Sequence, residues 1–88
     1  MKILLFEAVW CKDCKLMHTM WRNIELEMPD LEIQRRDIDE FKDLSMHIGV
    51  FEVPTAIFYD DDEVELIRIT GLRHRDVILD LINKNKNL

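Results

Sequence analysis

The sequence predicts a three-layer α/β/α sandwich around a four-stranded mixed sheet, and three observations support this fold class. Strand-like and helix-like segments occur in the order strand, helix, strand, helix, strand, strand, helix. The chain has 88 residues, 48% of them hydrophobic, so we expect one core and a single domain over residues 1–88. A right-handed crossover makes the first two strands parallel, and we expect the spatial strand order 2-1-3-4.

The first strand and the first helix have the clearest patterns. Residues Ile3 to Val9 are almost continuously apolar, which is typical of a strand covered on both faces. Residues Cys11 to Glu27 follow with helical periodicity, and Pro29-Asp30 ends this helix. We expect its buried stripe to comprise Leu16, Met17, Met20, Trp21, Ile24 and Met28.

The second strand is predicted to lie at the edge of the sheet. Leu31 to Asp37 carries several charged residues, and charge at an edge discourages pairing with other chains. A short helix should follow, capped by Asp39 at its start and stopped by Gly49. The residues of this helix that should face inward are Phe41, Leu44 and Ile48.

The last part of the chain predicts a hairpin followed by a helix. Thr55 to Tyr59 and Val64 to Thr70 are strand-like, and the acidic segment between them is a turn. Gly71 breaks the second of these strands. Arg73 to Asn85 should form the last helix, with a buried stripe of Val77, Ile78, Leu81 and Ile82.

Both cysteines of the chain lie in one motif, Trp10-Cys11-Lys12-Asp13-Cys14-Lys15. The motif follows the first strand and opens the first helix. Two thiols three residues apart at the N-terminus of a helix are typical of a thiol–disulfide redox site. A disulfide across so short a loop would stabilise the fold by only about 2 kcal/mol, which argues against a structural role.

The placement of the two thiols predicts their roles. Cys11 would lie where the free N–H groups and the dipole of the helix favour a thiolate, so it should be the nucleophile. Cys14, one turn deeper, should be the resolving thiol. Lys12 supports the thiolate and Asp13 opposes it, so we expect both to modulate the site. This chemistry needs no cofactor or metal besides the Cys11–Cys14 disulfide.

A metal site is the alternative use of the cysteines. Cys11, Cys14 and His18 could supply three ligands and His47 a fourth, although one cysteine pair with a histidine is only half of a common zinc-finger pattern. The chain would then be a binding module with an incidental or metal-bound dithiol.

Charge and composition bear on the partners and the location. The formal net charge is −6 and there is no basic cluster, so nucleic acid is not an expected partner. No apolar stretch is long enough to cross a membrane, and the first residues lack the apolar region of a signal peptide. We therefore expect a cytoplasmic monomer without membrane contact.

The element order and two motifs make the chain resemble the thioredoxin family over nearly its whole length. The cysteine motif is similar to the thioredoxin active site, and Val53-Pro54-Thr55 is similar to the cis-proline loop of that family. The resemblance implies reduction of protein disulfides, with a thioredoxin-reductase-type flavoprotein or glutathione as the reductant. The substrate-binding residues that it implies are Trp10, Val53, Pro54, Thr55 and Gly71.

Several departures from the family matter. The sequence begins with the active-site strand, as in glutaredoxins, so we expect a fold without the N-terminal strand and helix of full-length thioredoxins. Lys12-Asp13 replaces the usual Gly-Pro between the cysteines. Thr19 stands where the family has a helix-kinking proline, so we expect a straighter helix.

Proton handling should also differ from that of the family. Leu5 stands where thioredoxins have a buried aspartate. Glu7 lies two positions further along the strand and hence on the same face, so we expect it to accept the proton of Cys14. A glutathione-dependent glutaredoxin stays an alternative, although Glu52-Val53-Pro54 and Gly71-Leu72 differ from the segments that many such relatives carry.

Overall fold

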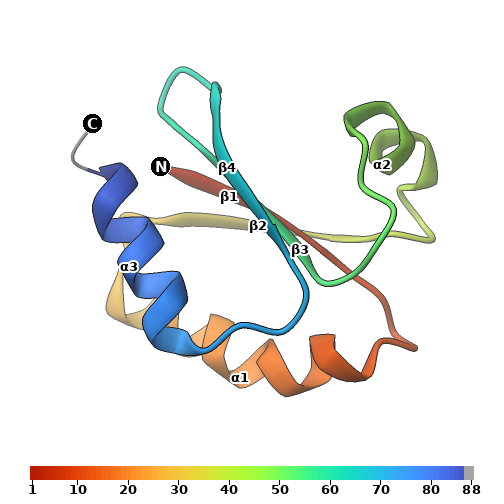
Figure 1. Ribbon diagram of the computed structural model, residues 1–88, viewed down its shortest axis with the longest axis horizontal. Helices are drawn as coiled ribbons and strands as arrows, with labels where there is room; N and C mark the ends of the chain where they lie inside the picture. Colours follow the sequence, from red (N-terminus) through yellow and green to blue (C-terminus); the bar gives the residue numbers. More distant parts are fainter. Residues whose placement is uncertain (87–88) are drawn as a thin grey trace.

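The computed structural model describes residues 1–86, and its elements follow the predicted order (Figure 1). The predicted bounds differ from the observed ones by at most two residues at the ends of the strands and of the first and last helices. The elements are β1 (Lys2–Glu7), α1 (Lys12–Glu27), β2 (Glu32–Asp37), α2 (Lys42–Ile48), β3 (Thr55–Tyr59), β4 (Glu65–Thr70) and α3 (Arg75–Lys86).

The strands form one four-stranded sheet in the order β2-β1-β3-β4, which confirms the predicted topology. β1 pairs with β2 in parallel and with β3 antiparallel, and β3 pairs antiparallel with β4. Figure 1 shows α1 and α3 on one face of the sheet and α2 on the other. The charged strand β2 is therefore an edge strand, as expected from its composition.

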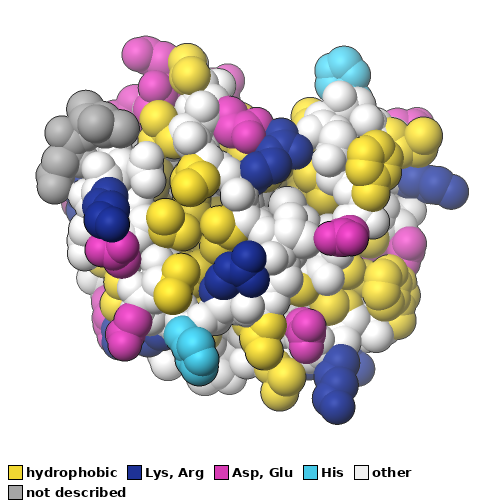
Figure 2. Space-filling view, in the orientation of Figure 1, with side chains coloured by type: hydrophobic (Ala, Val, Ile, Leu, Met, Phe, Trp, Pro, Cys, Tyr) yellow, Lys and Arg dark blue, Asp and Glu magenta, His cyan; other side chains and the backbone are white. Residues whose placement is uncertain are grey.

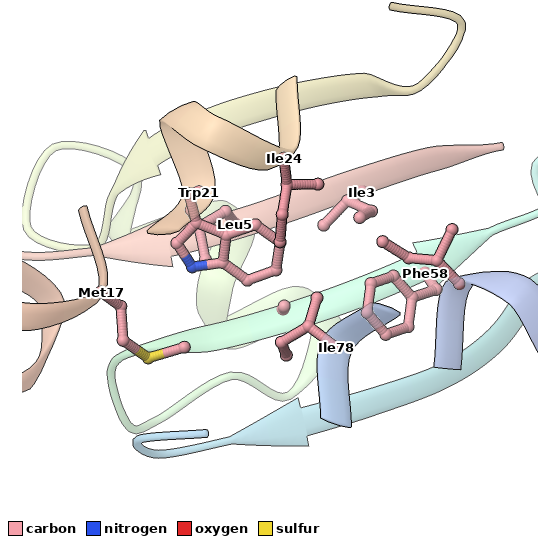
Figure 3. Close-up of a cluster of buried hydrophobic side chains, with 9 residues drawn as sticks. Ile3, Leu5, Met17, Trp21, Ile24, Phe58 and Ile78 are labelled. Atoms are coloured by element: carbon pink, nitrogen blue, oxygen red, sulfur yellow. The ribbon is translucent and has the colours of Figure 1, made fainter. Parts of the chain in front are cut away.

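The apolar character of β1 follows from its central position. Its side chains alternate between the two faces, and both faces are covered. Ile3 and Leu5 pack into the larger core cluster with Trp21 of α1 and Phe58 of β3 (Figure 3). The members of β1 that pack on the α2 side are Leu4 and Phe6.

Two predicted helix stripes were too wide. Met17, Trp21 and Ile24 are buried against the sheet, but Leu16 is 61% exposed. Leu16 lies about 100° around the helix from Met17. Because Met17 faces the sheet, Leu16 points away from it towards solvent. On α3 the same reason applies to Val77, which is exposed next to the buried Ile78.

The predictions for α2 were also partly wrong. Phe41 and Leu44 are exposed, because this seven-residue helix contacts the core mainly through Ser45, Ile48 and the following Val50. The N-cap residue of the helix is Phe41, and its side chain makes no capping hydrogen bond. Asp39 is therefore not the cap. The predicted stop at Gly49 is correct, with φ of 77° in the left-handed region that glycine adopts easily.

Candidate active site

The cysteine motif lies where the chain leaves β1 and enters α1. The N–H of Cys11 donates to the carbonyl of Ala8 at 3.1 Å, which closes a tight turn before the helix. Cys11 has extended backbone angles and is the N-cap residue of α1. The first sulfur of the motif therefore lies at the end of the helix where unpaired N–H groups favour negative charge.

The two cysteines form a disulfide in this structure. Their Cα atoms lie 5.2 Å apart, and both residues are buried. The N–H of Cys14 donates to Sγ of Cys11 at 3.1 Å. A backbone donor aimed at this sulfur stabilises a thiolate there when the disulfide is opened.

The loop before β3 lies against the dithiol. The Val53–Pro54 peptide bond is cis, and Val53 packs on the small cluster formed by Ala8, Cys11 and Cys14. Within residues 1–86, no backbone hydrogen bond involves the N–H or the carbonyl of Val53. Both groups are thus free to pair with another chain.

The neighbouring residues hold this loop in place. The Pro54 carbonyl accepts a hydrogen bond from the N–H of Gly71 at 2.8 Å. Gly71 has φ of 91°, which explains why glycine follows β4. The hydroxyl of Thr55 donates to the carbonyl of Glu52 at 2.6 Å and lies 3.2 Å from the hydroxyl of Thr70. The structure thus places both Thr55 and Gly71 next to the proline.

Trp10 is 65% exposed next to the dithiol, and its indole Nε1 donates to Oδ2 of Asp39 at 2.8 Å. Sequence reasoning assigned Asp39 to the start of a helix and missed this contact, because nothing in the pattern links two positions 29 residues apart. Figure 2 shows hydrophobic side chains on the surface where β1 leads into α1, with charged side chains among them.

The remaining candidates flank the dithiol. Lys12 and Asp13 are exposed in the first turn of α1, and neither forms an ion pair with another residue of the described chain. Glu7, at the end of β1, is half-buried and forms an ion pair with Arg35 of β2.

A cleft of about 400 Å³ opens beside Cys14, between α1 and the edge of the sheet. Glu7 and Cys14 both line it, so the structure brings these two predicted residues to one cleft. Its other lining residues are Ala8, Val9, Lys15, His18, Arg35, Arg36 and Asp37.

The cysteines do not belong to a recognisable metal site. Within residues 1–86, no group of three or more histidine, cysteine, aspartate or glutamate side chains is arranged to hold a metal ion. The structure therefore does not gather Cys11, Cys14, His18 and His47 into a ligand set. In the same range, no helix combines the length and the apolar character that crossing a membrane requires.

A Cys-x-x-Cys pair at the start of α1, on a mixed sheet of this topology, defines a thiol–disulfide oxidoreductase. The family model for thioredoxin matches residues 1–84, and the chain belongs to the thioredoxin family. Thioredoxins act on disulfide substrates and are reduced by thioredoxin reductase.

Individual relatives agree with this assignment. A thioredoxin of Chlamydia pneumoniae is 31% identical over 80 residues, which are 91% of this chain and 78% of that protein. A mutant thioredoxin of Halobacterium salinarum superposes with a TM-score of 0.85 at 29% identity, covering 94% of this chain and 72% of that one. Mitochondrial thioredoxin 3 of Saccharomyces cerevisiae, in its oxidized form, has the same fold, with a TM-score of 0.85 at 24% identity over 94% and 76% of the two chains.

Proposed function

We propose that this oxidoreductase reduces protein disulfides by a dithiol cycle in which Cys11 attacks and Cys14 resolves. The observation that carries the assignment of roles is the hydrogen bond from the Cys14 N–H to Sγ of Cys11 at the N-cap of α1. That donor and the helix dipole stabilise an anion on Cys11, whereas Cys14 lies within the first turn of the helix.

The cycle needs only thiol exchange. The Cys11 thiolate attacks one sulfur of the substrate disulfide, and the other substrate sulfur leaves as a thiolate. The Cys14 thiolate then attacks Sγ of Cys11, which forms the Cys11–Cys14 disulfide and releases the second substrate thiol. Two electrons pass to the substrate, and no cofactor takes part. A thioredoxin-reductase-type flavoprotein returns the dithiol to its reduced form.

The substrate is held along the cis-proline loop. The unpaired N–H and carbonyl of Val53 form a short strand edge beside the dithiol, and a substrate strand pairs with it. Trp10 provides apolar contact area, and Pro54, Thr55 and Gly71 fix the loop. Specificity for protein substrates thus comes from backbone pairing and an exposed aromatic side chain.

Three charged residues modulate the cycle. Lys12 and Asp13 lie in the first turn of α1 and act on the Cys11 thiolate with opposite signs. Glu7 lines the cleft of Cys14 and accepts its proton when Cys14 becomes the nucleophile. The protein works as a monomer in the cytoplasm, where the reducing environment keeps dithiols open.

An insulin-reduction assay tests this function. With NADPH and a thioredoxin reductase, the wild-type protein should reduce insulin disulfides, and the Cys11→Ser variant should not. Glutathione with glutathione reductase should support the reaction much less well than the flavoprotein. Reduction by glutathione alone at the same rate would assign the chain to the glutaredoxin type. Tight zinc binding without reduction by either system would contradict the redox function.

A further inference from the structure

Arg35, in the edge strand β2, is shared by two carboxylates. Its Nη1 lies 3.3 Å from both carboxylate oxygens of Glu7 in β1, and its Nη2 donates to Oε1 of Glu25 in α1 at 2.8 Å. All three side chains are partly buried, with 21% of Glu7, 28% of Arg35 and 41% of Glu25 exposed. We call these three residues the Glu7–Arg35–Glu25 triad.

The triad runs from the dithiol to the surface of α1. Glu7 and Arg35 line the same cleft as Cys14. Glu25 and Arg35 line an adjacent hollow together with Arg22 and Leu26. His18 also lines both hollows, but Arg35 is the residue that forms hydrogen bonds to both Glu7 and Glu25.

The charges of the triad do not balance. One guanidinium faces two carboxylates, so the triad carries a net charge of −1, and the uptake of one proton makes it neutral. The shorter contact of Arg35 is to Glu25, so a proton on Glu7 leaves a well-matched Arg35–Glu25 pair behind.

We propose that Glu25 is a positioning residue of the redox cycle: it shares Arg35 with Glu7 and so leaves on Glu7 the surplus negative charge that accepts the Cys14 proton. This inference rests on the proposed dithiol cycle. In the mixed disulfide, the S–H bond of Cys14 breaks and its proton passes to the Glu7 carboxylate through water in the cleft. The Cys14 thiolate then forms the bond to Sγ of Cys11, and the bond from Cys11 to the substrate sulfur breaks. The leaving thiolate takes up a proton, which Glu7 returns through the cleft.

Other charged groups face the same cleft. Lys15 and His18 of α1 lie along it, and Arg36 and Asp37 of β2 complete it. Arg36 donates to the carbonyl of Arg35 and lies over the Phe41 ring, and Asp37 accepts from two backbone N–H groups. The side chains of Arg36 and Asp37 are therefore bound to groups other than the side chains of the Glu7–Arg35–Glu25 triad. His18 is an ionisable side chain that lines the same cleft, so the experiment includes its removal.

A two-step thiol reaction measures the proton transfer directly. Reduced protein reacts with dithiobis(nitrobenzoate): Cys11 displaces the first nitrobenzoate thiolate and keeps the second as a mixed disulfide. Cys14 then displaces that second thiolate. The rate of the second absorbance phase against pH reports the deprotonation of Cys14, while the first phase reports Cys11 alone.

The triad predicts opposite effects for two variants. In Glu25→Gln, Arg35 pairs with Glu7 alone, so Glu7 becomes a weaker proton acceptor. The rate of the second phase should fall about threefold at neutral pH, and the acid limb of its pH–rate profile should move to lower pH. In Arg35→Gln, Glu7 gains surplus charge and the acid limb moves to higher pH. Glu7→Gln loses this acid limb altogether. Glu27→Gln is the matched control, because Glu27 pairs with Arg75 away from the cleft, and it should leave both phases unchanged.

The outcomes separate the two levels of the proposal. If the wild-type protein shows no rapid first phase, the dithiol cycle itself is wrong. If both phases occur but Glu25→Gln and Arg35→Gln move the acid limb in the same direction, or not at all, the role of the triad is wrong. The same shifts must appear in a His18→Gln background, and a shift that disappears there would assign the acid limb to His18. Compared with Arg35→Gln, Arg35→Lys keeps the positive charge and should restore part of the wild-type pH–rate profile of the second phase. A purely structural role of Arg35 would not require this partial recovery.

Discussion

The indole N–H of Trp10 donates to Oδ2 of Asp39 at 2.8 Å, which joins the loop before the dithiol to the connection between β2 and α2. The ring is exposed, but this bond fixes its orientation. An aromatic side chain that is held in place loses little conformational entropy when a partner binds. The contact therefore prepares the surface next to Cys11 for its substrate.

Removing this hydrogen bond should weaken substrate binding more than turnover. For Asp39→Ala we expect the KM for a protein disulfide to rise about threefold, with kcat nearly unchanged, since one hydrogen bond contributes about 1 kcal/mol. Asp39→Asn keeps an acceptor and should stay close to the wild type. Steady-state kinetics with insulin or another disulfide protein makes the measurement. An equal loss of kcat in both variants would show that Asp39 acts on the chemistry instead.

The two cysteine variants should fail in different ways. Cys11→Ser has no nucleophile and should abolish both reduction and covalent capture. Cys14→Ser should still attack, but it cannot resolve, so it should accumulate a mixed disulfide between Cys11 and the substrate. Non-reducing electrophoresis and intact mass measurement distinguish the two. Accumulation of the covalent complex in Cys11→Ser would reverse the assigned roles.

Trp21 is central to the core, yet its polar atom has no partner. The side chain is 1% exposed, and within residues 1–86 no acceptor lies within hydrogen-bond distance of its Nε1. An unpaired buried N–H costs about 1–3 kcal/mol, which offsets part of what the large ring contributes. Trp21→Phe should therefore change the free energy of unfolding by less than about 1 kcal/mol, whereas Trp21→Ala should lower it by about 3–5 kcal/mol. Urea denaturation gives both values, and a large loss in Trp21→Phe would indicate a partner for this N–H.

Acid should destabilise the hairpin end of the sheet. The N-terminal amino group lowers the pKa of Asp61 below its ordinary value of 3.8 by a hydrogen bond, and Lys2 does the same for Glu63, whose ordinary value is 4.5. Arg68 lowers the pKa of Glu65 in the same way. Because these pKa values are depressed in the folded state, their stabilisation is present above the unfolded values and is lost as the pH falls below about 4.5.

Denaturation at about pH 6 and about pH 3 tests this pH dependence. The variant that combines Asp61→Asn, Glu63→Gln and Glu65→Gln should lose less stability between the two conditions than the wild type. Asp62→Asn is the control, since Asp62 lies in the same turn and its carboxylate forms no ion pair within residues 1–86. Equal losses of stability between the two pH values in the triple variant and in the Asp62→Asn control would show that these three carboxylates do not cause the pH dependence.

The sequence predicted those features that depend on neighbouring residues. The apolar run of β1, the helical period of α1 and the handedness of crossovers were enough for the sheet order. The dithiol was predictable because Cys11 and Cys14 belong to one helical turn.

Contacts between distant segments were not predictable in the same way. No local pattern links Trp10 to Asp39, nor Arg35 to Glu7 and Glu25, since each bond depends on how separate elements pack. The exposure of Leu16 also depends on packing, because an apolar side chain beside a buried stripe has the same helical period as the stripe itself.

The rate of alkylation of the reduced protein as a function of pH tests the central claim most directly. If the first turn of α1 holds Cys11 as a thiolate, carbamidomethylation of Cys11 should be half-maximal at a clearly lower pH than the value of about 8.5 for a free cysteine. Mass spectrometry should locate the label on Cys11 and not on Cys14. A half-maximal rate at the pH of free cysteine, or labelling of Cys14 first, would contradict the mechanism.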